Sequence, residues 1–297
     1  MSVGVSVSDA LSLAPVVLVM GKGGVGKTTV AAGLASLTAR SSGRSVLVEF
    51  GDGAPGRRAL GENEARVEHL VIRPQDAVAR GAAPLFGSST VSKLVLGNFA
   101  MKPLLKAAPA VRELAMLESV RQIAAARPGV RVVVDMPATG HSVAWLRIPR
   151  QGREFLASGP IFEMCERIGV ELLHASRSSV VVVTLPEPLV LEETLELCDA
   201  LDAEVRVDCL IVNRVTPALP ASVLAEAQEL GRRSDAVGEA ARWLSSTLEA
   251  RVQARRNAID AISALSGNAR RVRHLPSSVE APSAEMASRW LASEGLS

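Results

Sequence analysis

Short, continuous runs of apolar residues recur along the chain, and longer segments with apolar positions at helical spacing lie between them. A strand that is apolar on both faces is typical of a parallel sheet covered by helices on both sides. The six clear runs are Val16–Met20, Ser45–Phe50, Val67–Ile72, Val130–Asp135, Ser179–Leu185 and Val207–Val212. A weaker seventh candidate strand is Arg271–Leu275.

The segments between these runs predict helices. They are Thr28–Arg40, Pro109–Ala126, Glu187–Leu201 and Ala221–Leu265, the last broken near Gly231–Asp235. Alternation of strands and helices predicts a doubly wound α/β fold with a mostly parallel sheet. Because the alternation runs through nearly the whole chain, we expect one domain over residues 1–297.

Two stretches, 76–108 and 151–176, interrupt the alternation. Both contain apolar residues, Gly and Pro, without a strand between them. We expect them to form a small helical layer at one end of the sheet. Their apolar residues are explained either by packing against the sheet or by a groove for a client or partner protein.

Composition narrows the class of protein. The chain has 297 residues, 48% of them apolar, and a net charge of +2, which argues against a disordered chain and against a strongly basic nucleic-acid binder. The three cysteines form no C-x-x-C pair, no apolar run reaches the roughly 18 residues of a membrane span, and the first residues lack a basic signal-peptide region. We therefore expect a cytoplasmic protein without stable membrane insertion.

A phosphate-binding loop is the strongest motif. The sequence between the first strand and the first helix, GKGGVGKTT, matches G-x-x-x-x-G-K-[ST]. Glycines let successive amides face one anion, Lys27 is expected to reach the β- and γ-phosphates of ATP, and the Thr28 hydroxyl is expected to bind Mg²⁺. The residues predicted to bind nucleotide here are Gly21, Gly23, Gly24, Val25, Gly26, Lys27, Thr28 and Thr29.

Lys22 is a second lysine in this loop, in a chain with only five lysines. The arrangement K-G-G-V-G-K-T-T resembles the deviant phosphate-loop group. In that group this lysine reaches the nucleotide of the other subunit, so the resemblance implies a homodimer with Lys22 in a catalytic role. The alternative is a solvated loop lysine.

A heptad after the fourth strand, Asp135-Met136-Pro137-Ala138-Thr139-Gly140-His141, resembles switch II of the arsenical-pump and tail-anchored-protein-targeting ATPase family. The resemblance implies that Asp135 holds Mg²⁺ through water, and that Pro137, Thr139, Gly140 and His141 respond to the γ-phosphate. His141 is otherwise a simple loop histidine.

Switch I of that family follows the second strand. Counting from the strand start places Asp52 on the family's water-orienting carboxylate, with a further contribution to the metal site. Gly53 and Pro55 depart from the family's D-P-A-H pattern. An aspartate in a surface turn is the alternative reading of Asp52, and Glu49 is an alternative carboxylate.

Later segments extend the resemblance. Asn213 after the sixth strand matches the family's adenine-reading Asn, and Pro276 begins a segment like its adenine loop. Family features are also missing: the chain lacks the three-thiolate metalloid site, the C-x-x-C zinc clasp and the long methionine-rich client insert.

The residues and the resemblance together predict an ATP-hydrolysing dimeric switch that acts on a protein client or membrane partner, which no motif identifies. One alternative is a positioning ATPase of the ParA/MinD kind, which binds DNA or membrane. The segment SAEMASRWLASEGLS has little positive charge, which argues against membrane binding, whereas Arg251, Arg255 and Arg256 leave DNA binding open. Another is a nucleotide-dependent scaffold whose altered switch I has lost turnover.

Overall fold

A computed structural model describes residues 12–61, 65–85, 109–202, 204–265 and 271–293. Its centre is a seven-stranded sheet in the order β3-β2-β4-β1-β5-β6-β7, with every pair parallel. The strands are β1 Val16–Met20, β2 Ser45–Phe50, β3 Val67–Ile72, β4 Arg131–Asp135, β5 Ser178–Thr184, β6 Val207–Val215 and β7 Arg271–Pro276. The predicted doubly wound α/β fold is confirmed.

Helices cover both faces of the sheet because its strands bury alternate side chains on opposite sides. Leu18 faces the layer formed by α3 (Pro74–Leu85), α6 (Pro109–Ala125), α7 (Thr139–Phe155), α8 (Pro160–Glu171) and α9 (Pro188–Asp202). Val17 faces the layer formed by α1 (Lys27–Ser42), α2 (Ala54–Leu60) and α12 (Ala284–Ala292). This double cover explains why the central strands β1, β4 and β5 consist largely of apolar residues.

Helices α1 and α12 touch at very short range. A Cβ built on Gly33 of α1 would lie 2.7 Å from the Ala287 Cβ of α12. Ser283 caps α12 by accepting a hydrogen bond from the Met286 amide. Chain segments more than two hundred residues apart therefore pack as one layer.

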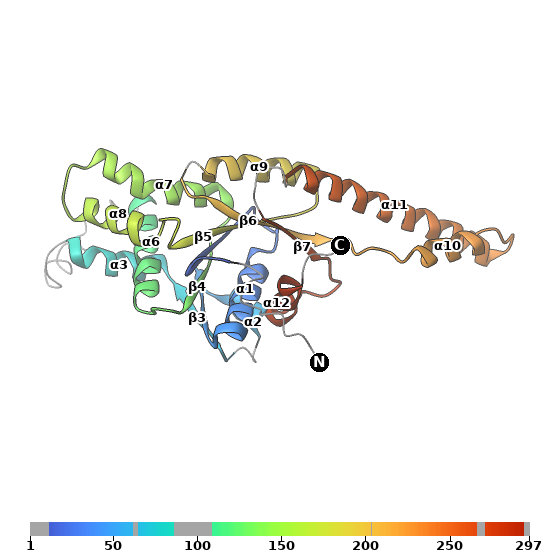
Figure 1. The fold of residues 1–297 in the computed structure, drawn as a ribbon, viewed down its shortest axis with the longest axis horizontal. Coiled ribbons are helices and arrows are strands. Elements are labelled where there is room, and N and C mark those ends of the chain that lie inside the picture. The colour runs from blue at the N-terminus through green and yellow to red at the C-terminus, as the bar shows by residue number, and fades with distance from the viewer. Residues whose placement is uncertain (1–11, 62–64, 86–108, 203, 266–270, 294–297) are drawn as a thin grey trace.

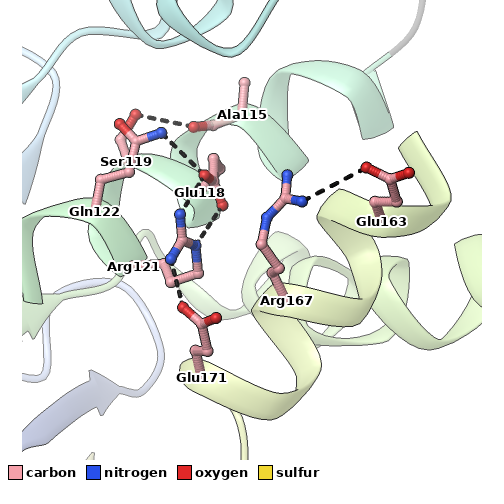
Figure 2. A network of polar contacts seen from close by, with 8 residues as sticks. All are labelled: Ala115, Glu118, Ser119, Arg121, Gln122, Glu163, Arg167 and Glu171. Carbon is pink, nitrogen blue, oxygen red and sulfur yellow. Dashed lines mark hydrogen bonds and ion pairs between the residues drawn. The ribbon is translucent and has the colours of Figure 1, made fainter. Parts of the chain in front are cut away.

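A polar network joins α6 and α8 (Figure 2). Arg121 donates to Glu118 through Nε and Nη2, both at 2.7 Å, and to Glu171 of α8 at 2.5 Å. These two carboxylates raise the pKa of the Arg121 guanidinium. The network fixes α8 on α6, while Arg167 and Glu163 pair along α8 itself.

The structure describes the two predicted helical insertions only in part. Residues 76–85 lie in α3, and the stretch 151–176 forms the end of α7 and all of α8. Both sets of helices gather at one end of the molecule beside α6 (Figure 1). Residues 86–108 lie outside the described residues, so the division into one domain with two insertions stays a prediction.

The helical hairpin α10 (Ala221–Leu230) and α11 (Ala236–Leu265) projects beyond the sheet (Figure 1). The break between α10 and α11 falls near Gly231–Asp235, as predicted. There Arg242 donates hydrogen bonds to the carbonyl oxygens of Gly231 and Arg233. Trp243 on this hairpin is 72% exposed. None of the helices that the structure describes is long and apolar enough to cross a membrane.

Candidate functional site: a phosphate loop that is bonded to its own chain

The loop between β1 and α1 has the backbone that the motif predicts. Gly21, Gly24 and Gly26 have φ angles of 147°, 83° and 95°, in the region that favours glycine. A Cβ built on Gly21 would lie 2.3 Å from the Val183 carbonyl oxygen, so this position is sterically closed to other residues. Gly26 precedes α1 without any side-chain cap, which leaves the helix amides directed at the loop.

Lys27 is folded back onto the loop. Its Nζ donates a 2.8 Å hydrogen bond to the Lys22 carbonyl oxygen. Burial lowers the pKa of the Lys27 ammonium, and the nearby Asp135 carboxylate opposes that shift. The amine is thus partly desolvated and faces a carboxylate, as expected for a group that receives a phosphate. Thr29 lies one residue further along the first turn of α1, and Val25 is buried beneath the loop.

Thr28 and Asp135 lie together. The Thr28 hydroxyl donates a 2.5 Å hydrogen bond to Asp135 Oδ2, although the residues are 107 positions apart. Asp135 Oδ1 is buried and has no hydrogen-bond partner within the described part of the chain. Burial raises the Asp135 pKa to about 6, the Thr28 bond opposes this shift, and the Glu49 charge adds to it. A hydroxyl and an unsatisfied buried carboxylate oxygen fit the ligands that Mg²⁺ takes beside phosphates.

Lys22 is paired within its own chain. Its Nζ makes a short ion pair with Glu193 of α9, and both side chains are about half exposed. No sequence pattern indicates Glu193, because a glutamate on an exposed helix face has no motif and its contact with Lys22 spans 171 positions. The predicted reach of Lys22 into a second subunit stays a prediction.

Asp52 lies in the turn between β2 and α2. Its Oδ1 accepts from the Ala54 amide at 2.9 Å, and its carbonyl oxygen accepts from Arg57 at 2.9 Å. Gly53 precedes α2 with φ 71°, which a proline at this position could not adopt. The departure from the family's D-P pattern therefore has a backbone reason, and the role of Asp52 stays a prediction.

Glu49 occupies a different setting from Asp52. Its side chain is 5% exposed, and its carboxylate accepts from the Gly56 amide and contacts His69 Nε2 at 2.8 Å. The β2–β4 register places Glu49 beside Asp135. Both carboxylates thus lie at the carboxyl-terminal ends of their strands, the same end of the sheet at which the phosphate loop follows β1. Sequence reasoning missed His69, which sits on the adjacent strand β3 without a motif.

The switch II segment follows β4 as the resemblance implied. A Cβ built on Gly23 would lie 3.9 Å from Ala138, so this segment borders the phosphate loop. Pro137 precedes α7, which begins at Thr139 and includes Gly140 and His141 in its first turn. The side chains of Thr139 and His141 lie outside the described ones. Further along α7, Trp145 packs edge-on against Phe50 of β2, with ring centroids 5.1 Å apart.

Asn213 is hydrogen-bonded to the phosphate loop. Its Nδ2 donates to the Val25 carbonyl at 2.8 Å, and its Oδ1 accepts from the Arg214 amide at 2.9 Å. Asn213 lies inside β6, not after it, because β6 continues to Val215 and pairs there with Pro276 of β7. Pro276 is the last residue of β7, and an irregular segment follows it up to Ser283, the residue that caps α12. Adenine contacts by either residue stay a prediction.

The parallel sheet, the glycine loop and the Lys27–Thr28–Asp135 arrangement define a P-loop nucleotide-binding protein of the α/β class. The chain belongs to the family of CobQ/CobB/MinD/ParA nucleotide binding domains, whose family model matches residues 16–239. It is 28% identical over 235 residues to "ATPase BagA" of Mycobacterium tuberculosis and to "Putative ATPase Mb3704" of Mycobacterium bovis. Each alignment covers 71% of this chain and 68% of the relative.

Proposed function

We propose that this chain hydrolyses ATP in the presence of Mg²⁺ and works as a dimeric switch of the arsenical-pump and guided-entry kind. The observation that carries the proposal is the set of contacts at the loop mouth. Lys27 bonds a loop carbonyl, Thr28 bonds Asp135, and Asp135 Oδ1 is left without a partner. Each of these groups is one that a Mg²⁺-bound triphosphate would engage. The names of the mycobacterial relatives support an ATPase.

The proposed chemistry is positioning and charge neutralisation. The loop amides and Lys27 hold the phosphates, while Thr28 and Asp135 hold Mg²⁺. When bound, Mg²⁺ neutralises charge that develops on the phosphate oxygens. Asp52 orients the attacking water and accepts its proton, so that a hydroxide equivalent attacks the γ-phosphorus and ADP leaves.

In the proposed mechanism two subunits form a homodimer. Lys22 leaves Glu193 and reaches the nucleotide held by the partner subunit. Loss of the γ-phosphate then moves the segment that runs from Pro137 to the start of α7. Helix α7 transmits this movement to the helices beside α6. The client is a protein or membrane partner whose chemistry stays open.

Phosphate release with MgATP tests this proposal, with wild type compared with Lys27→Ala, Lys22→Ala and Asp52→Asn. Arg58→Ala serves as control because it removes an exposed cation from α2, next to the site. We expect all three site variants to lose turnover, and only Lys27→Ala to lose nucleotide binding. Full turnover by Lys22→Ala and Asp52→Asn would refute the dimeric mechanism. Tight nucleotide binding without any turnover in wild type would favour the scaffold alternative.

A second candidate is nucleotide-dependent DNA binding. Arg251, Arg255 and Arg256 of α11 line a cavity of about 140 Å³, and Arg255 is anchored to the Thr216 carbonyl at 2.8 Å. Membership in a family that includes MinD and ParA domains supports testing this reading. Such binding should weaken steeply with salt, and the Arg251→Ala/Arg256→Ala double variant should lose it while keeping ATP turnover.

A further inference from the structure

Glu49 anchors the turn that carries Asp52. The Gly56 amide, in the first turns of α2, lies 3.0 Å from both carboxylate oxygens of Glu49. His69 Nε2 contacts Glu49 Oε2 at 2.8 Å from the neighbouring strand β3. The carboxylate is buried, so these contacts supply the hydrogen bonds that water would otherwise make.

The backbone is fitted closely around this anchor. A Cβ built on Gly56 would lie 2.1 Å from Glu49 Oε2, and a Cβ built on Gly53 would lie 2.3 Å from Val71 Cγ2. Only glycine at these positions lets α2 rest on β2 and β3. The turn between β2 and α2 is therefore held in place on both sides of Asp52, at its start in β2 and at Gly56 in α2.

Asp52 lies between the two clamped ends. Its own carboxylate bonds the Ala54 amide, and Arg57 bonds its carbonyl oxygen. A shift of α2 relative to β2 would therefore move Asp52 with it. The contacts that resist such a shift are those of Glu49 with Gly56 and His69.

We propose that Glu49, oriented by His69, is a positioning residue that holds Asp52 where it can orient the attacking water. This inference rests on the proposed role of Asp52. We assign Glu49 a positioning role because its side chain is only 5% exposed, so an attacking water has little access to its oxygens. Its effect on turnover passes through the position of the turn.

Steady-state kinetics of Glu49→Ala, Glu49→Gln and His69→Gln provide the first test. Misplacement of a catalytic group costs about tenfold to a hundredfold in rate. We expect Glu49→Ala to lose kcat by that amount, with KM for ATP changed by less than about twofold. Glu49→Gln should recover part of the loss, because its amide oxygen still accepts from Gly56. Glu68→Gln is the matched control, since Glu68 lies next to His69 on β3 but pairs with Arg127.

A double-mutant cycle separates positioning from a direct role. If Glu49 acts through Asp52, the Glu49→Ala/Asp52→Asn protein is no slower than Asp52→Asn alone. Losses that multiply would overturn the inference while leaving the function of Asp52 intact. Full turnover by Asp52→Asn alone, with Glu49→Ala still slow, would overturn both. If thermal melting shows that Glu49→Ala does not fold, Glu49→Gln takes its place in the cycle.

Discussion

The Thr28 hydroxyl donates its hydrogen to Asp135 Oδ2 across 2.5 Å, joining the first turn of α1 to the end of β4. Together with the bond from Lys27 to the Lys22 carbonyl, this contact satisfies polar groups at the loop mouth within the chain. In the proposed MgATP complex, the phosphates and the metal would exchange these bonds for their own.

Asp135 should make the stability of the ligand-free protein depend on pH. Its pKa is raised from 3.8 to about 6, so the folded chain holds this proton more tightly than the unfolded chain. The free energy of unfolding therefore falls as the pH rises from about 4 to about 6. At about 1.4 kcal/mol for each pH unit, the difference between the two pKa values corresponds to roughly 3 kcal/mol.

Asp135→Asn removes this titration but retains an acceptor for Thr28. Denaturant unfolding without ligand should show the variant more stable than wild type by up to roughly 3 kcal/mol at pH 8, and equally stable at pH 4. The same variant should lose Mg²⁺-dependent turnover. Parallel pH profiles for the two proteins would contradict the assigned burial of Asp135.

If the proposed homodimer forms through Lys22, breaking the Lys22–Glu193 pair should favour it. Exposed ion pairs contribute about 0.2–1 kcal/mol, so Glu193→Gln should tighten ATP-dependent dimerisation by at most about fivefold for each pair broken. Glu192→Gln, which changes the exposed neighbour on α9, is the control. Light scattering over a range of protein concentrations measures the effect, and weaker dimerisation by Glu193→Gln would argue that Glu193 serves the dimer instead.

Two loop glycines should respond differently to alanine. Gly21→Ala places a Cβ 2.3 Å from the Val183 carbonyl at a φ of 147°, so we expect a loss of about 1–3 kcal/mol in stability. Gly23→Ala meets only the Ala138 Cβ at 3.9 Å, an ordinary contact, and should leave the melting temperature nearly unchanged. Thermal melts of both variants check this, and equal losses would show that the loop backbone differs from the one described.

Asn213→Ala distinguishes support of the loop from adenine recognition. If Asn213 mainly holds the Val25 carbonyl, affinity for ATP and GTP should fall by similar factors. If Asn213 reads the base, ATP affinity alone should fall. Titration with fluorescent ATP and GTP analogues gives the ratio. The bond to Val25 leads us to expect similar losses, about fivefold to tenfold for one buried hydrogen bond.

Sequence patterns located the strands well, because burial on both faces leaves a local apolar signal in the central strands. Val16–Met20, Ser45–Phe50 and Val67–Ile72 match to the residue. Strand β6 runs three residues beyond its apolar run, since its end is set by pairing with Pro276, which no local pattern encodes.

The phosphate loop was also readable, because Gly21, Lys27 and Thr28 stand in one short motif between a strand and a helix. Its surroundings were not. The contacts of Lys22 with Glu193, of Glu49 with His69 and of Asn213 with Val25 each join separate elements. Tertiary packing creates such contacts from residues that carry no motif of their own.

The close fit of Gly33 against Ala287 has a consequence for synthesis of the chain. Helix α1 starts at the phosphate loop, and its neighbour α12 lies more than two hundred residues further along the chain, so translation produces α12 well after α1. Until α12 arrives, the outer face of α1 stays in water. We therefore expect a nascent chain to hold nucleotide weakly and to acquire its full affinity only after α12 has docked on α1.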